Sequence, residues 1–91
     1  MILSFADKTT EELANGRAPR GIPMPLAKQA AKRLAYLAAA IRIEDLFIPP
    51  SNRFHALKGT GRYSLWVNDQ WRISFVWTDA GPQDAKFEDY H

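Results

Sequence analysis

The chain has 91 residues, no cysteine and a formal net charge of +2, from 12 Lys and Arg against 10 Asp and Glu. This length predicts one domain over residues 1–91 with a modest core, and the hydrophobic content of 46% argues against disorder. Disulfides and thiolate metal sites are excluded, and no apolar run reaches the roughly 18 residues that a membrane helix needs.

The N-terminal region predicts a strand followed by a short helix. Residues 1–6 are rich in apolar side chains, which favours a strand. Thr9 or Thr10 is the expected N-cap of the helix, because a threonine hydroxyl accepts from the free N–H groups of the first turn. Asn15 and Gly16 are expected to end it.

A longer helix is predicted to begin near Pro25, which suits a first helical turn. Its basic residues Lys28, Lys32 and Arg33 fall largely off the apolar stripe, so we expect them to face solvent. One further turn is expected at residues 43–47. The apolar stripe that should pack on a sheet consists of Leu26, Ala30, Leu34, Leu37, Ala38 and Ile41.

The pattern becomes that of β-strands from Arg53 onward, because residues 49–52 carry two prolines and are expected to end any helical structure. Two alternating strands flank a turn at residues 68–70. If their large apolar groups share one face, Arg72 lies on the other face, opposite Trp66. The pairs that this register predicts are Tyr63 with Phe75, Leu65 with Ile73, and Val67 with Trp71.

Residues 79–82 predict another turn and residues 83–90 a last strand. The order of strand, helices and then hairpin-linked strands predicts an α+β fold.

The segment from residue 53 to residue 75 is basic, with one acid, Asp69. A local basic field favours an anionic ligand such as nucleic acid, and a solvated basic surface is the alternative. The cations of this segment are Arg53, Lys58, Arg62 and Arg72.

Several of these residue types suit RNA cleavage without a metal, which needs a proton acceptor, a proton donor and cations on the phosphate. Alternation places His55 with Leu57 on one side of a strand, and Phe54 with Lys58 nominally on the other. A lone histidine in a strand is more often structural.

Arg72 is a stronger candidate, because a guanidinium on the face away from the core can fork onto phosphate. The alternatives are a cation–π contact with Trp66 or an ion pair with an acid of the last strand. Tyr90 and His91, taken alone, would be a frayed chain end. No metal site is evident, because two histidines and scattered acids are too few signals.

Several short blocks together resemble a known family. The Asn-Asp-Gln-Trp-Arg block at 68–72 and the terminal Asp-Tyr-His at 89–91 are specific in combination, and blocks at 1–5, 44–53, 57–59 and 63–64 extend the match over nearly the whole length. On these residues the chain resembles the HigB-like toxins of the RelE superfamily, the toxin half of bacterial toxin–antitoxin pairs.

The resemblance implies a RelE-like α+β fold, with an N-terminal strand and two helices on one face of a mostly antiparallel twisted sheet. It implies an endoribonuclease that needs no metal or other cofactor and cleaves mRNA in the A site of a translating ribosome in the bacterial cytoplasm. It also implies a helix-turn-helix antitoxin, HigA-like, through which alone the toxin reaches operator DNA, and no membrane partner.

The resemblance also implies roles for single residues. Lys58 and Arg72 match positions that stabilise the scissile phosphate, and Tyr90 with His91 matches a terminal active-site pair. His55 matches a histidine found in some members. The expected RNA-binding residues are Arg62, Trp66 and Arg53.

One position departs from the family pattern: Trp66 stands where many relatives carry arginine. A tryptophan there can stack on an RNA base, and Arg62 is expected to supply the missing charge. The departure also motivates an alternative hypothesis, a RelE-like module that binds antitoxin or RNA with weak or no catalysis.

Overall fold

The structure is a computed structural model in which residues 1–90 are described. None of the described helices is both long and apolar enough to cross a bilayer. The elements in chain order are the α-helices α1 (Lys8–Ala14) and α2 (Met24–Ala39), the 3-10 helices η1 (Ile43–Phe47) and η2 (Pro50–Asn52), and the strands β1 (His55–Leu57), β2 (Arg62–Trp66), β3 (Trp71–Thr78) and β4 (Gly81–Asp89).

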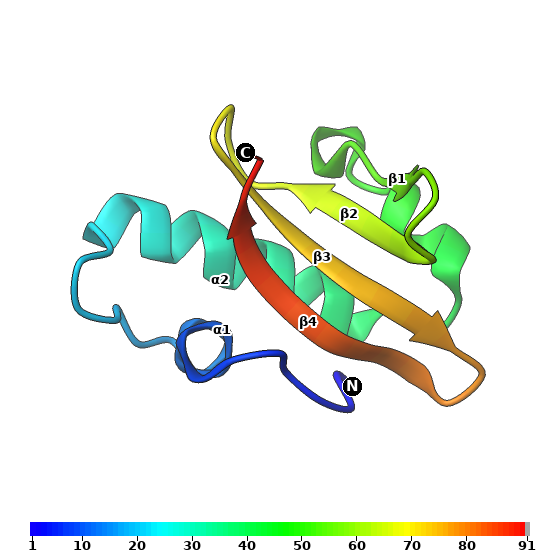
Figure 1. The fold of residues 1–91 in the computed structure, drawn as a ribbon, viewed down its shortest axis with the longest axis horizontal. Helices are drawn as coiled ribbons and strands as arrows, with labels where there is room; N and C mark the ends of the chain where they lie inside the picture. Colours follow the sequence, from blue (N-terminus) through cyan, green and yellow to red (C-terminus); the bar gives the residue numbers. More distant parts are fainter. Residues whose placement is uncertain (91) are drawn as a thin grey trace.

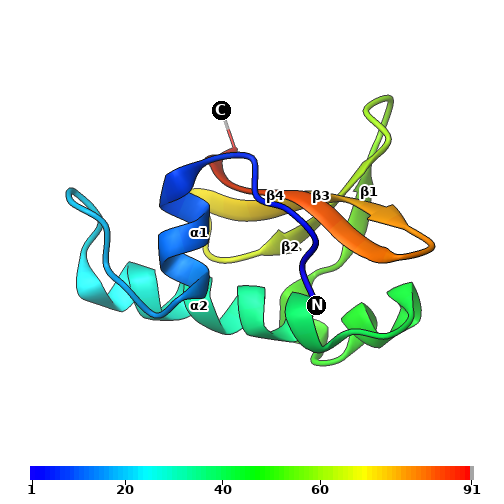
Figure 2. The ribbon, with the colours of Figure 1, turned by 90° about the horizontal axis from the view of Figure 1, so that it is seen from below.

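The four strands form one antiparallel sheet in the order β1-β2-β3-β4, so that each strand pairs with its neighbour in sequence (Figure 1). Helix α2 runs along one face of this sheet, and α1 lies on the same side toward β4 (Figure 2). Among the described elements, no helix covers the opposite face. The α+β class is therefore confirmed, and one sheet face remains open.

The β2–β3 register agrees with the sequence prediction. Tyr63 pairs with Phe75, Leu65 with Ile73, and Trp66 with Arg72. This register places the large apolar groups against α2, where their burial drives folding. The largest fully buried apolar side chains are Leu13, Leu34, Leu37, Leu46, Leu65, Ile73 and Phe75.

The predicted N-terminal strand is wrong as a full strand. In the described part of the chain, this segment forms one isolated parallel bridge, between Phe5 and Ala85, and a further backbone hydrogen bond joins Leu3 to Pro82. Asp84 has a left-handed backbone with a φ of 54°, beside the irregularity in the β3–β4 ladder. A bulge bends its strand, so the N-terminal segment follows β4 only briefly.

Helix α1 is capped by Asp7, and the prediction of Thr9 or Thr10 as the cap is wrong. Asp7 Oδ1 accepts from the Thr10 backbone N–H at 2.8 Å and from its hydroxyl at 2.6 Å. The Thr10 hydroxyl oxygen accepts from the Phe87 N–H at 2.9 Å. Thr10 is buried because it joins α1 to β4. The predicted stop at Asn15 and Gly16 is confirmed.

Helix α2 begins and packs largely as predicted, with two corrections. Ile41 lies beyond the helix and is 87% exposed, because α2 ends at Ala39. Arg33 was expected in solvent but is buried, since its Nη1 donates to Asn52 Oδ1 at 2.8 Å and to Ser51 Oγ at 3.3 Å.

The expected end of helical structure at residues 49–52 is also wrong, because residues 50–52 form η2, while the further turn at 43–47 is confirmed as η1. Asn52 is fully buried. Its amide donates to the Leu46 carbonyl at 3.2 Å and to the Ile48 carbonyl at 3.4 Å. Asn52 thus ties η1, η2 and α2 together, and it fixes the point from which the chain enters the sheet at Arg53.

Candidate functional site

The open face of the sheet carries a row of polar and aromatic side chains across three strands. Trp66 pairs with Arg72, and Arg72 pairs with Glu88. Directly opposite residues of neighbouring strands project to the same face, so these side chains are neighbours. Extending the β1–β2 register by one pair on this face places Arg53 opposite Trp66. We call Arg53, Trp66, Arg72 and Glu88 the arginine row.

Arg72 is held from two sides. Its Nε and Nη2 donate to Glu88 Oε2 at 2.9 and 2.6 Å, and its guanidinium carbon lies 5.3 Å from the centroid of the Tyr90 ring. Of the two alternatives considered from the sequence, the ion pair with an acid of the last strand is present. The cation–π partner is Tyr90 and not Trp66. No hydrogen bond joins Arg72 Nη1 to any residue from 1 to 90, which leaves that nitrogen for a ligand.

The Trp66 ring contacts a different cation, Arg53. The Arg53 guanidinium carbon lies 4.1 Å from the centroid of the Trp66 ring, a cation–π contact. Arg53 reaches it from a left-handed backbone with φ of 45° at the end of η2. At the position where the resemblance led us to expect an arginine, a guanidinium is therefore still present, supplied by Arg53.

Arg62, which was expected to supply that charge, has other partners. Its Nη1 donates to the Asp84 carboxylate at 2.7 Å and its Nη2 to the Asp84 carbonyl at 2.6 Å. The expectation of an acid-poor surface is corrected here, because β4 brings Asp84 and Glu88 onto the open face. The sequence segment 53–75 is basic, but its spatial neighbourhood is of mixed charge.

His55 pairs with Ser64 at the edge of the sheet. Its Nδ1 lies 2.8 Å from the Arg53 carbonyl, and a carbonyl only accepts, so Nδ1 donates this hydrogen bond. Of the two ring nitrogens, Nε2 is then the one that can accept. Phe54 lies on the core side, stacked on Tyr63 at 5.4 Å, as alternation predicted.

The structure does not bring Lys58 together with the arginine row. Lys58 is exposed and lies in the turn that enters β2 at Arg62, whereas Trp66 ends that strand. The four residue steps along β2 separate these ends by about 13 Å. The role of Lys58 stays a prediction.

Tyr90 packs against the sheet, where a chain end on its own was expected to fray: its N–H donates to the Gln70 carbonyl at 2.9 Å and its ring contacts Arg72. Burial raises the pKa of the Tyr90 phenol above its usual value, while the charges of Arg72 and Arg53 lower it in part. The phenol is therefore neutral at physiological pH and available as a proton donor. His91 lies outside the described residues.

Sequence reasoning placed Ser74 on the face of Arg72 without giving it a role, and it missed two further residues of the open face, Lys86 and Glu88. These two were detectable, because Phe87 faces the core and alternation then turns Lys86 and Glu88 outward. Within residues 1–90, no group of three His, Cys, Asp or Glu is arranged to hold a metal ion.

Two helices on one face of a four-stranded antiparallel sheet, with an arginine-bearing open face, are consistent with the class of RelE-like toxins. A family model described as "HigB-like toxin: RelE-like toxin of type II toxin-antitoxin system HigB" matches residues 3–91. Toxin HigB-1 of Vibrio cholerae serotype O1 is 39% identical over 83 residues, which cover 88% of this chain and 87% of that protein. The chain belongs to the HigB-like family and is the toxin of a type II toxin–antitoxin system, with an antitoxin as its partner.

Glu88 makes the stability of this toxin pH-dependent. Partial burial raises the pKa of its carboxyl, but hydrogen bonds from Arg72 and Ser74 and the charges of Arg72 and Lys86 outweigh burial and lower it below the ordinary 4.5. A lowered folded-state pKa gives stability that is present above the unfolded-state pKa and is lost as the pH falls through the folded-state value.

We therefore expect Glu88→Gln to have a lower free energy of unfolding than wild type at pH 7, and the gap to close as the pH falls below about 4.5. Urea unfolding of both proteins at a series of pH values measures this difference in the free energy of unfolding. Asp79→Asn, in the exposed turn between β3 and β4, is the matched control and should show no such convergence. A gap that is constant from pH 7 to pH 3 would contradict the prediction.

Proposed function

We propose that this toxin is an mRNA endoribonuclease that cleaves message in the A site of a translating ribosome and so stops translation. One observation carries the proposal: the guanidinium groups of Arg53 and Arg72 are fixed in one row on an open sheet face, beside the neutral phenol of Tyr90. Fixed guanidinium groups bind phosphate through paired N–H donors.

The proposed reaction uses the RNA's own 2′-hydroxyl as nucleophile. The 2′-oxygen loses its proton and attacks the adjacent phosphorus, the bond from phosphorus to the 5′-oxygen breaks, and that oxygen takes a proton. The products are a 2′,3′-cyclic phosphate and a 5′-hydroxyl, so atoms and charge balance without a metal or cofactor. Cations that hold the phosphoryl oxygens stabilise the extra negative charge of the transition state.

The residue roles follow the chemistry of each group. Arg72, through its Nη1, and Arg53 hold the phosphate, and Lys58 adds charge from the turn before β2. His55 Nε2 is a candidate for the base. Tyr90 orients or protonates the leaving oxygen, and His91 is proposed to share the proton transfers. Trp66 holds Arg53 and thereby serves RNA binding, and Arg62 acts through its contacts on the open face.

The decisive experiment adds purified toxin to ribosomes stalled with mRNA in the A site and maps the new RNA ends. The proposal expects cuts only in ribosome-bound message, with 5′-hydroxyl and 2′,3′-cyclic phosphate ends. Ends with 5′-phosphate would indicate attack by a metal-activated water instead. A well-folded toxin that makes no cuts would overturn the proposal.

The proposed partners complete this assignment. We infer a helix-turn-helix antitoxin of the HigA type, with contact to operator DNA only through that antitoxin, and we infer the ribosome and mRNA as targets in the bacterial cytoplasm. Copurification of the toxin with the product of an adjacent helix-turn-helix gene tests the first of these.

A second candidate function is a module that binds antitoxin or RNA without efficient cleavage. It is favoured by the engagement of Arg72 with Glu88 and by Trp66 at a position where relatives carry arginine. Ribosome binding without any cuts in the experiment above would support it.

The Arg53–Trp66 contact gives a prediction of its own. Arg53→Ala and Trp66→Ala should each lower the rate of cleavage about tenfold, because each loses a fixed guanidinium that is worth one to two charge-assisted bonds. The double variant should be no slower than the slower of the two single variants, because both changes break the same Arg53–Trp66 contact. Lys32→Ala, exposed on α2, is the control. Additive losses would show that Trp66 contacts RNA independently.

A further inference from the structure

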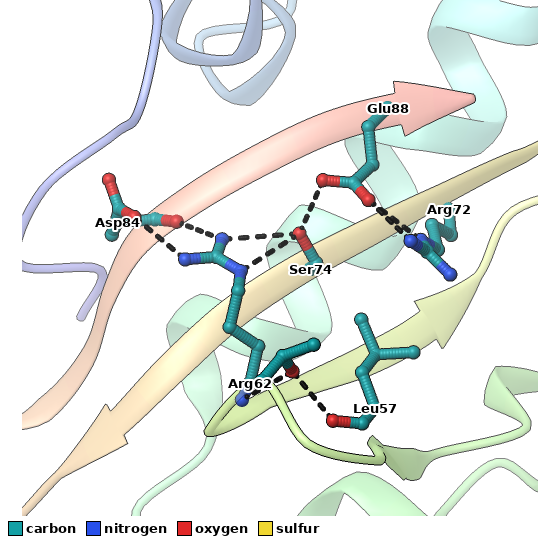
Figure 3. Close-up of polar contacts among 7 residues, drawn as sticks. Leu57, Arg62, Arg72, Ser74, Asp84 and Glu88 are labelled. Atoms are coloured by element: carbon teal, nitrogen blue, oxygen red, sulfur yellow. Dashed lines mark hydrogen bonds and ion pairs between the residues drawn. The ribbon is translucent and has the colours of Figure 1, made fainter. Parts of the chain in front are cut away.

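A continuous chain of polar contacts runs across the open face from Asp84 to Arg72 (Figure 3). Asp84 accepts from Arg62, and Arg62 donates through Nε and Nη2 to Ser74 Oγ at 3.3 and 3.1 Å. Ser74 Oγ donates to Glu88 Oε1 at 2.8 Å, and Glu88 Oε2 accepts from Arg72. We call these five residues the relay.

The direction of every bond in the relay is determined. A guanidinium has no acceptor, so Ser74 Oγ must accept from Arg62. Its single proton is then free only for Glu88 Oε1. This leaves Glu88 Oε2 as the oxygen that takes both N–H groups of Arg72. Ser74 thus links Arg62 to the Glu88 carboxylate, and Glu88 links Ser74 to Arg72.

The relay is anchored at its far end in the backbone. Asp84 sits in a left-handed conformation at the irregular part of β4, and its N–H donates to Ser4 Oγ at 2.9 Å. Both its carboxylate and its carbonyl accept from Arg62. The Arg62 side chain is therefore held in one orientation, since most of its guanidinium N–H groups donate hydrogen bonds.

At the near end of the relay, no residue from 1 to 90 accepts a hydrogen bond from Arg72 Nη1. Glu88 takes Nε and Nη2, and the Tyr90 ring lies against the guanidinium. Arg72 and Glu88 are about one-fifth exposed, so the pair is neither sealed from ligand nor free in solvent. An arginine held in this way presents Nη1 in a constant orientation, which is the preorganisation that transition-state stabilisation requires.

We propose that Glu88 is a positioning residue for Arg72, and that Asp84, Arg62 and Ser74 hold Glu88 in place. The proposal rests on the proposed function for its catalytic meaning, but the positioning itself is a property of the free protein. Glu88 acts through Arg72 and does not itself contact the RNA.

The first test measures the free protein. The Arg72 Nε–H signal in ¹⁵N-correlated NMR should be protected from solvent exchange in wild type. Ser74→Ala and Glu88→Gln should each speed that exchange by about tenfold, whereas Lys32→Gln on α2 should not. Ser74→Ala is the milder variant, because it removes one hydroxyl and keeps the Arg72–Glu88 pair. Unchanged exchange in both relay variants would overturn the proposal whatever their activity.

The second test measures cleavage on programmed ribosomes. Glu88→Gln should lower kcat about 10- to 100-fold, because misplacement of a catalytic group by about 1 Å costs that much, and KM should change less than about threefold. A loss of kcat with unchanged Arg72 exchange would mean that Glu88 acts directly on RNA, which overturns positioning. Faster exchange in a toxin whose wild type makes no cuts would support the relay and refute the endoribonuclease assignment instead.

Discussion

Replacing Arg72 by alanine should remove ribosome-dependent RNA cleavage almost completely, with kcat/KM falling about 100- to 1000-fold. Arg72 is the cation of the open face that is held from both sides, by Glu88 and by the Tyr90 ring. Alanine removes the fork that, under the proposed function, holds the phosphate in the transition state. Arg72→Lys should recover only part of the loss, because an ammonium keeps the charge but cannot hold Glu88 and phosphate in fixed directions.

Single-turnover cleavage on programmed ribosomes measures the effect, with thermal unfolding of each variant as the structural check. Arg72→Ala should stay folded, because the side chain lies on the open face and leaves the core intact. Its complex with the antitoxin should also form if the antitoxin binds elsewhere, which separates folding from catalysis. Cleavage by Arg72→Ala within about threefold of wild type would remove Arg72 from the mechanism.

The sequence was sufficient to predict the central hairpin, because two independent patterns agreed there. Apolar residues alternate in both strands, and only one register brings Tyr63 opposite Phe75 and Leu65 opposite Ile73. The same register forced Arg72 onto the open face opposite Trp66. The part of the candidate site that depends on local alternation was therefore predictable before any coordinates.

The partners of the site residues were not predictable in the same way. Whether Arg72 pairs with Glu88 depends on the β3–β4 register, which in turn depends on the irregularity beside Ser74 and the left-handed Asp84. No local sequence pattern indicates such a bulge. The same irregularity brings Asp84 to Arg62, and the cation beside Trp66 is Arg53, whereas Arg62 was expected to supply that charge.

Arg33 shows the limit of a periodicity argument. At helical spacing it lies beside the apolar stripe, and a long charged side chain there normally reaches solvent. It is buried because η2, a turn that the prolines seemed to forbid, brings Asn52 within hydrogen-bond distance. Burial of a charge depends on a tertiary partner, and that partner is 19 residues away in sequence.

The Arg33–Asn52 contact predicts the largest loss of stability. Asn52→Ala should lower the free energy of unfolding by about 3 kcal/mol, because it leaves a buried guanidinium without its main acceptor and two carbonyls without a donor. The midpoint of thermal unfolding should fall by about 12–24 °C. Arg33→Met should cost only about 1 kcal/mol, since it removes the buried charge together with the need to satisfy it.

Urea unfolding of both single variants and the double variant measures the coupling between them. The double variant should lose less than the sum of the two single losses, because without Arg33 no charge is left unpaired. Ser51→Ala, at the longer 3.3 Å contact of the same guanidinium, is the control and should cost about 0.5 kcal/mol or less. If Asn52→Ala lowered the free energy of unfolding by less than about 1 kcal/mol, a water molecule would be accepting the hydrogen bond from Arg33 in place of Asn52.

The same contact connects the core to the candidate site. Asn52 is followed directly by Arg53, whose left-handed backbone directs its side chain over Trp66. At a temperature where Asn52→Ala is still folded, its cleavage rate should therefore fall toward that of Arg53→Ala, while Arg33→Met retains a rate near wild type. Equal rates for the two variants would show that Arg53 finds Trp66 without help from η2. Unequal rates would make this buried amide, which belongs to the core and not to the open face, part of what positions the arginine row.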